Sequence, residues 1–307
     1  MTQTAFLFPG QGSQSPGMGL ALAERYAEAR AVFDQADEVL DFPLSRLCFE
    51  GPARELKLTE NTQPAILTVS VATLAVLQMR GVAPDYVAGH SLGEYSALVA
   101  AGSIAFPDAL RLVRKRGQCM QQAVPKGVGA MAALLGMDDA RVHDVCRQAA
   151  EGQVVSAANL NSPSQIVIAG HAEAVRRAVR IAKGAGARRA VLLQVSAPFH
   201  CALMEPARDQ MAPFLDAARI GNLDVPMINN WQAREVRTGP EAREGLKQQI
   251  PNPVLWHQSM RLLASRGVGR FVEIGPGRVL AGLMRGIDRS LRGRSTHNVA
   301  SVEAISK

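Results

Sequence analysis

The most constraining feature of the sequence is the run Gly89-His90-Ser91-Leu92-Gly93, which has the pattern G-x-S-x-G. A short apolar segment, residues 84–88, precedes it, and a helix of small and apolar residues ending near Gly102 is predicted after it. Glycines on both sides of a serine remove the Cβ clashes of a sharp strand-to-helix turn, which leaves the hydroxyl exposed at a helix N-terminus. The pattern therefore indicates an α/β fold with Ser91 as a candidate nucleophile. A glycine-flanked turn with a helix-capping serine is the competing interpretation.

A serine hydroxyl needs a base to take its proton, and His200 is the preferred candidate among the six histidines. It follows Pro198-Phe199 on a predicted loop. His90 adjoins Ser91, but neighbouring side chains at such a turn are expected to point apart. Cys201 is a second candidate nucleophile, although a buried bystander thiol fits it better. The remaining histidines are expected on helices, in packing or in the polar C-terminal stretch: His143, His171, His257 and His297.

A glycine-rich loop, residues 9–17, follows the apolar segment 4–8, which is predicted to be a buried strand. The loop lacks the Gly-Lys-Ser/Thr ending of a P-loop and the G-x-G-x-x-G spacing of dinucleotide-binding proteins. A nucleotide-binding module without acyl-transfer activity is therefore the less favoured alternative. We expect the loop to bring a backbone N–H toward the site, as an oxyanion hole requires from a second loop.

The middle of the chain consists of short alternating elements in the order βαββαβ, which is typical of a ferredoxin-like unit. We predict a small subdomain, 127–196, inserted into a larger α/β domain formed by residues 1–126 and 197–307. The predicted strands are 128–135, 154–158, 165–169 and 188–195, and the predicted helices are 138–150 and 173–183.

Composition and charge exclude several classes of protein. The net charge of +7 comes from arginines spread along the chain, without the basic blocks of a nucleic-acid binder, and favours anionic ligands or an acidic partner. The four cysteines have no C-x-x-C spacing, so we expect no metal site and a reducing, cytoplasmic environment. The N-terminus has no signal-type segment, and no window of about 18 uncharged apolar residues predicts a membrane span. We expect a monomer.

Seven short segments, which follow one another along nearly the whole chain, match the motifs of a known family in the same order. They are 8–14, 89–95, 114–117, 159–163, 198–200, 252–256 and 273–277. Together they resemble the malonyl-CoA:acyl carrier protein transacylases of fatty acid synthesis. The resemblance implies an α/β-hydrolase-like main domain with a ferredoxin-like insertion, in agreement with the βαββαβ order.

The resemblance also implies roles for individual residues. Ser91 would be the acylated nucleophile and His200 its base, with the oxyanion hole formed by the backbone N–H groups of Gln11 and Leu92. Arg116 would hold the malonyl carboxylate, because a planar guanidinium binds a carboxylate bidentately. On the sequence alone, Arg116 is one of several basic residues on a helix, for which a solvated face is the default expectation.

Further implied positions surround the base. In this family, no carboxylate completes the site. The backbone carbonyl at the position of Gln249 orients the histidine, although Pro251 departs from the family pattern in this loop. Asn159 and Asn161 lie nearby, and Phe199 resembles the malonyl-selective type, whose ring leaves little room for a 2-methyl branch.

The resemblance implies an acyltransferase that moves malonyl from a coenzyme A thioester to an acyl carrier protein by a ping-pong mechanism, without metal or cofactor. A stand-alone acyltransferase of a polyketide pathway would have the same residues. A related serine thioesterase or hydrolase would use water as acceptor, but no triad carboxylate stands out after Ser91.

Overall fold

The fold is built on two separate β-sheets, and a computed structural model describes residues 2–305 of the chain. The larger sheet has the strand order β10-β9-β1-β2-β7-β8, and all neighbouring strands are parallel except the pair β7 and β8. Parallel pairing places the carboxyl ends of β1 and β2 at one edge, where the sequence analysis expected the site. The strands are β1 (Gln3–Phe8), β2 (Tyr86–Gly89), β7 (Met227–Ile228), β8 (Glu235–Val236), β9 (Val268–Glu273) and β10 (Gly293–Ser295).

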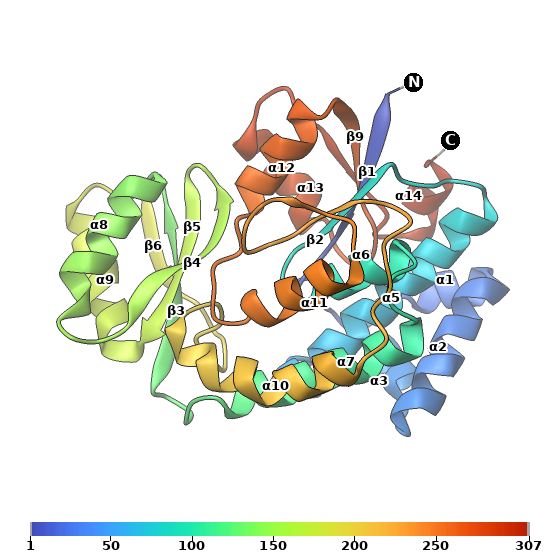
Figure 1. Cartoon of the computed structure of the whole chain (residues 1–307), viewed down its shortest axis with the longest axis horizontal. Coiled ribbons are helices and arrows are strands. Elements are labelled where there is room, and N and C mark those ends of the chain that lie inside the picture. The colour runs from blue at the N-terminus through green and yellow to red at the C-terminus, as the bar shows by residue number, and fades with distance from the viewer. Residues whose placement is uncertain (1, 306–307) are drawn as a thin grey trace.

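Helices surround this sheet, and both chain ends lie on the side of the molecule away from the smaller sheet (Figure 1). They are α1 (Leu20–Arg25), α2 (Ala27–Leu40), α3 (Leu44–Glu50), α4 (Ala53–Leu56), α5 (Thr59–Met79), α6 (Gly93–Ala100), α7 (Phe106–Gln122), α10 (Glu205–Ala217), α11 (Gly239–Gln248), α12 (Trp256–Ser265), α13 (Val279–Ile287) and α14 (Val299–Glu303), with a 3₁₀ turn, η1 (Ala202–Met204), before α10.

Helix α5 lies in the middle of the core. It begins at Thr59 without a side-chain cap, and Pro64 lies inside the helix. By length and composition alone α5 is also a candidate membrane span, which corrects the sequence expectation. However, 83% of that window is buried inside the protein, as in the core helix of a globular domain.

The smaller sheet has the order β4-β5-β3-β6 with every neighbouring pair antiparallel, the arrangement of a ferredoxin-like unit. It and its two helices form the left part of the view in Figure 1. The elements are β3 (Gly129–Leu135), α8 (Asp139–Ala150), β4 (Val155–Ser162), β5 (Gln165–His171), α9 (Ala172–Gly184) and β6 (Arg189–Leu192). The predicted order is confirmed.

The largest differences from the predicted boundaries in this unit are at the ends of two strands. Strand β4 continues to Ser162, because bulged pairing with β5 accommodates the polar residues after Ala157. Strand β6 ends at Leu192, short of residue 195.

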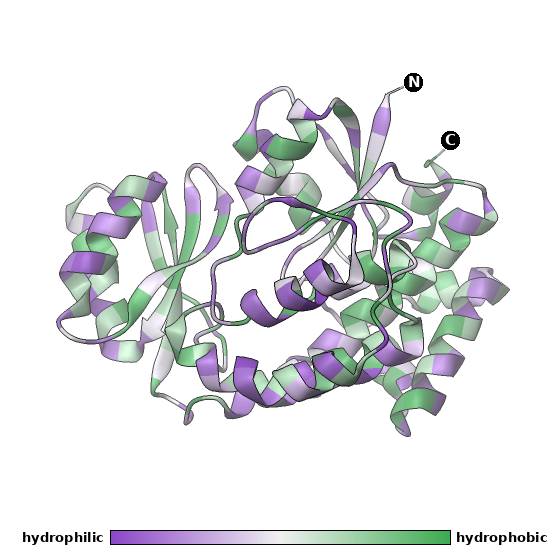
Figure 2. Cartoon of the chain, in the orientation of Figure 1, coloured by the Kyte–Doolittle hydropathy of each residue, from purple (hydrophilic) through white to green (hydrophobic). Residues whose placement is uncertain are grey.

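Figure 2 shows the polar character of α11, which is mainly purple.

Candidate active site

Ser91 lies on a sharp turn between β2 and α6. Its backbone φ is +53°, a left-handed conformation that is uncommon for a residue with a side chain. A Cβ on Gly89 would lie 1.9 Å from the backbone of Gly93, and a Cβ on Gly93 would lie 2.1 Å from the carbonyl oxygen of Phe8. Both glycines are therefore required by close backbone approach, which is the physical reason for the G-x-S-x-G pattern.

Asn230, two residues after the end of β7, holds this turn. Its Oδ1 accepts a hydrogen bond from the backbone N–H of Ser91 at 2.6 Å, and its Nδ2 donates to the carbonyl oxygen of Gly89 at 2.6 Å. The sequence analysis missed this residue. The signal that could have found it is a buried polar side chain just after β7, the strand that pairs with β2.

The hydroxyl of Ser91 lies 2.8 Å from Nε2 of His200, although the two residues are 109 positions apart. Nδ1 of His200 lies 2.8 Å from the backbone oxygen of Gln249, despite Pro251 in the same loop. Because a carbonyl can only accept, Nδ1 carries the proton and Nε2 is free to accept from Ser91. Burial, and then the positive charge of Arg116, lower the pKa of His200 to about 3, so the imidazole is neutral near pH 7.

Arg116 is buried, with 1% of its surface exposed, instead of lying on the solvated face of α7. Its Nη1 donates to Oε1 of Gln63 at 2.8 Å, and its Nη2 donates to Oε1 of Gln249 at 2.8 Å and to Ser91 Oγ at 3.1 Å. Within residues 2–305, Arg116 forms no ion pair, and its Nε has no hydrogen-bond partner. A buried cation held only by neutral groups is suited to bind an anion.

A cleft of about 740 Å³ opens over this cluster, between the large sheet unit and the small one. Among the predicted site residues, Gln11, Leu92, Asn159 and Phe199 line it together with Ser91, His200 and Arg116.

Asn161 is not among the lining residues of the cleft; its Oδ1 lies 2.8 Å from Nε2 of His90. His90 also lines the cleft, and the centre of its ring lies 5.4 Å from that of Trp256.

The glycine-rich loop packs directly on the turn at Ser91. A Cβ on Gly10 would lie 2.5 Å from the carbonyl oxygen of His90, so only a glycine allows this approach. Gln11 follows immediately and its Oε1 accepts from the hydroxyl of Thr59 at 2.8 Å. The loop therefore contributes to the floor of the cleft.

Cys201 is a poor nucleophile in this position. Its thiol is buried and donates to the carbonyl oxygen of Pro198 at 3.1 Å. Burial raises the pKa of Cys201 to about 12, so thiolate is scarce near neutral pH. Across the described residues 2–305, no group of three or more histidine, cysteine or acidic side chains is placed to hold a metal ion.

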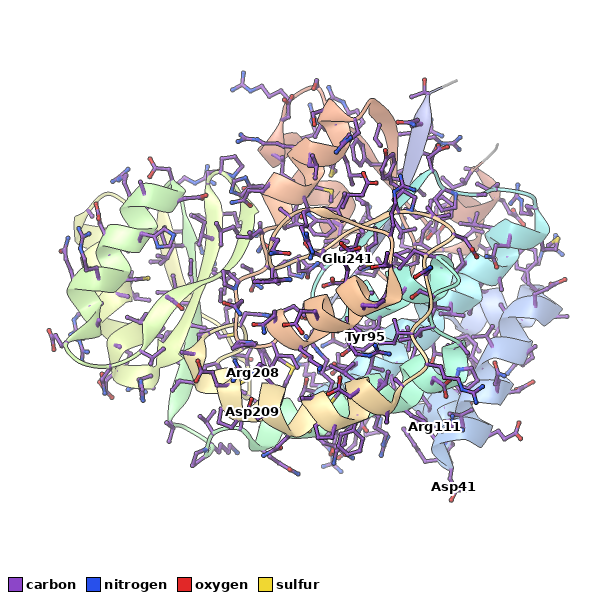
Figure 3. All side chains as sticks on the ribbon, viewed as in Figure 1. Asp41, Tyr95, Arg111, Arg208, Asp209 and Glu241 are labelled. Atoms are coloured by element: carbon purple, nitrogen blue, oxygen red, sulfur yellow. The ribbon has the colours of Figure 1, made fainter. Side chains whose placement is uncertain are left out.

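Gln63 and Glu94 are also buried near Arg116, and neither was predicted. Gln63 is a long polar residue next to the mainly apolar part of helix α5, which is a signal that sequence reasoning could have used. Figure 3 labels Tyr95, the residue next to Glu94, near the middle of the molecule. The Cζ atom of Arg116 lies 5.9 Å from the centre of the Tyr95 ring.

Together the fold and this site define an acyltransferase. A family model described as an acyl transferase domain matches residues 5–305. The chain is 49% identical to the malonyl CoA-acyl carrier protein transacylase of Bacillus subtilis, covering 99% of this chain and 96% of that protein. It is also 49% identical to the protein of the same name from Escherichia coli, covering 99% of each. The chain belongs to the malonyl-CoA:acyl carrier protein transacylase family.

Solved structures agree with this assignment. An acyl carrier protein S-malonyltransferase from Vibrio cholerae superposes with a TM-score of 0.97 at 46% identity, covering 99% of both chains. A malonyl-transacylase in complex with a type II polyketide synthase acyl carrier protein superposes with a TM-score of 0.96 at 45% identity, covering 98% of both chains.

Proposed function

We propose that this chain transfers the malonyl group of malonyl-CoA to the phosphopantetheine thiol of an acyl carrier protein, by way of a malonyl ester on Ser91. One observation carries the proposal: the Ser91 hydroxyl contacts a neutral imidazole nitrogen at 2.8 Å and a buried guanidinium at 3.1 Å. A base for the serine and a cation for the acyl carboxylate therefore meet at a single oxygen.

In the first half-reaction, Ser91 gives its proton to Nε2 of His200 and its oxygen attacks the thioester carbonyl. The carbon–sulfur bond then breaks, and the leaving coenzyme A thiolate takes the proton from His200. In the second half-reaction, the carrier thiol gives its proton to His200 and attacks the ester, and Ser91 regains the proton as it leaves. The backbone N–H groups of Gln11 and Leu92 are assigned to the developing oxyanion.

Arg116 is assigned to the malonyl carboxylate. The malonyl carboxylate would form an ion pair with a guanidinium that otherwise contacts only neutral groups. An acetyl group has no charge with which to form this ion pair. Phe199 is assigned to the exclusion of branched acyl groups, since its ring lines the same cleft. Asn159 and Asn161 are assigned to the substrate side of the cleft.

The division of the chain is part of the proposal. Residues 1–126 and 197–307 form the catalytic domain and 127–196 the inserted subdomain, which is supported by a separate apolar core drawn mainly from residues 132–190. We also propose a cytoplasmic monomer that needs no cofactor and binds neither nucleic acid nor membrane.

The pathway proposed for the carrier is fatty acid synthesis. A polyketide pathway is the second candidate, because one similar structure contains a type II polyketide synthase carrier. Comparing malonyl transfer to purified carriers of the two kinds distinguishes them: the preferred carrier is the one with the higher kcat/KM.

Intact mass spectrometry tests the proposal directly. Incubation with malonyl-CoA should add one malonyl mass, and later addition of holo carrier protein should remove it. Ser91→Ala should abolish the adduct, while Cys201→Ala should keep it. An adduct that persists in Ser91→Ala would refute the nucleophile, and loss of malonyl to water at the rate seen with carrier would indicate a hydrolase.

A further inference from the structure

The side-chain amide of Gln249 lies between polar groups of opposite character. Its Oε1 accepts from Nη2 of Arg116 at 2.8 Å. Its Nε2 donates to Oε2 of Glu94 at 2.9 Å and to the carbonyl oxygen of Ser91 at 3.2 Å. The oxygen end of the amide thus faces a cation, and the nitrogen end faces two acceptors. These contacts are separate from the bond between the Gln249 backbone and His200.

An amide has a donor end and an acceptor end, and a half-turn exchanges them. In the reversed orientation, the NH₂ group of Gln249 would face the guanidinium N–H groups of Arg116. Its oxygen would face the carboxyl oxygen of Glu94 at the other end. With Glu94 ionised, or protonated on Oε1, both contacts would lack a hydrogen bond, which is unfavourable for buried polar groups. The acceptors at the nitrogen end therefore select the orientation in which Gln249 accepts from Arg116.

Glu94 is the stronger of these two acceptors by distance, and the mechanism does not use it. It lies in the first turn of α6, fully buried, and its Oε1 has no hydrogen-bond partner among residues 2–305. Burial raises the pKa of Glu94 to about 8. A proton on Oε1 leaves Oε2 a carbonyl oxygen, so Oε2 accepts from Gln249 in both protonation states.

We propose that Glu94 is a positioning residue: by accepting from Nε2 of Gln249, it keeps Oε1 of Gln249 on Arg116 and so fixes the guanidinium where it faces the acyl carboxylate. The inference rests on the role proposed above for Arg116. Without Glu94, only the carbonyl oxygen of Ser91, at 3.2 Å, holds the nitrogen end of the amide, so Gln249 can turn and the guanidinium loses one of its two amide supports. Only malonyl offers a carboxylate to that guanidinium, so malonyl transfer should fall more than acetyl transfer, and the ratio of the two should fall.

The experiment compares kcat/KM for acylation of Ser91 by malonyl-CoA and by acetyl-CoA, measured by rapid quench and intact mass. Glu94→Met removes the acceptor at similar volume and should lower the malonyl-to-acetyl ratio by about tenfold or more. Glu94→Gln keeps an acceptor oxygen and should restore the ratio to within about threefold of the parent chain. Gln249→Met should lower the ratio as Glu94→Met does, because the backbone carbonyl that holds His200 is retained.

A double-mutant cycle separates positioning from general damage. In the Gln249→Met background, Glu94→Met should have a much smaller effect on the ratio, because the hydrogen-bonded route to Arg116 is already removed and only the direct electrostatic interaction between the two side chains is left. A fall of the ratio as large as the one that Glu94→Met causes alone would overturn the proposal. So would an equal loss of malonyl and acetyl transfer in Glu94→Met. If Glu94→Met does not fold, an unchanged ratio in Gln249→Met overturns it instead.

Arg116→Ala distinguishes this inference from the proposed function. If Arg116→Ala leaves the malonyl-to-acetyl ratio unchanged, the role proposed for Arg116 fails, and the positioning role of Glu94 fails with it. If Arg116→Ala lowers the ratio and Glu94→Met does not, only the role of Glu94 fails.

Discussion

Nδ1 of His200 lies 2.8 Å from the backbone oxygen of Gln249, so a carbonyl and not a carboxylate orients the imidazole. A carbonyl fixes the tautomer as a triad carboxylate does, but it adds no negative charge beside the ring. Burial and the cation of Arg116 are therefore offset only in part, by backbone hydrogen bonds to the ring, and the pKa of His200 falls to about 3. The base is neutral at all pH values at which such a protein is expected to work.

The first prediction concerns the pH dependence of acylation. Because the pKa of His200 is about 3, lowering the pH from 8 to 5 should not protonate it, and the rate of Ser91 malonylation should show no step near 6.5. Rapid-quench mass spectrometry across this range measures the rate. A fall by half near pH 6.5 would show that the imidazole titrates like one in water.

The same pKa predicts a change of stability with pH. The pKa of His200 is lower in the folded chain than the value of 6.5 for a free side chain, so the unfolded chain binds the proton more readily. The contribution of His200 to stability is therefore complete above pH 6.5 and is lost as the pH falls from 6.5 toward 3. Urea unfolding at several pH values measures this loss, which should be smaller in His200→Gln. An equal loss in both proteins would assign it to other groups.

Arg116 is the subject of the third prediction. Charge-assisted hydrogen bonds contribute roughly 1.5–3 kcal/mol each, so Arg116→Ala should lower kcat/KM for malonyl-CoA by about a hundredfold or more relative to acetyl-CoA. Arg111→Ala is the matched control, because Arg111 lies on the same helix with 59% of its side chain exposed. Equal losses with the two substrates would mean that Arg116 does not bind the carboxylate.

The sequence predicted β1, β2 and the order of the small unit because apolar runs and turn residues are local signals. It failed at the end of β4, where bulges let the strand continue through Asn159 and Asn161 to Ser162.

The site was less accessible to sequence reasoning. Ser91 has a local pattern, and His200 could be preferred only by elimination. Arg116 is buried where α7 packs against α5. The periodicity of α7 does not identify this arginine as a site residue. Asn230 contacts the site through strand order, so its proximity to Ser91 is a property of the tertiary structure alone. Glu94 is only three positions from Ser91, but no local pattern indicates that its carboxyl group is buried against Gln249.

The fourth prediction concerns the glycine after the nucleophile. Gly93→Ala places a methyl group 2.1 Å from the carbonyl oxygen of Phe8, a backbone atom that cannot move alone. Overpacking of this kind costs about 1–3 kcal/mol or more, and the turn at Ser91 should distort. The urea concentration at the midpoint of unfolding and the rate of Ser91 malonylation should both decrease. Gly282→Ala is the control: its Cβ meets nothing within 4 Å on α13, so it should leave stability unchanged or raise it by about 0.5–1 kcal/mol.

The last prediction concerns the acyl branch. Phe199 lines the cleft beside His200 and is 8% exposed, so its ring occupies space that a 2-methyl group would need. A pocket discriminates one methyl group by about 1–3 kcal/mol, and Phe199→Ala should therefore raise the methylmalonyl-to-malonyl ratio by roughly tenfold or more. Competition between equal concentrations of the two coenzyme A thioesters, followed by intact mass of the acyl-enzyme, measures the ratio directly. Phe214→Ala, at an exposed ring on α10, is the control and should not change it. If Phe199→Ala loses malonyl transfer without gaining methylmalonyl transfer, the ring supports His200 and another part of the cleft excludes the branch.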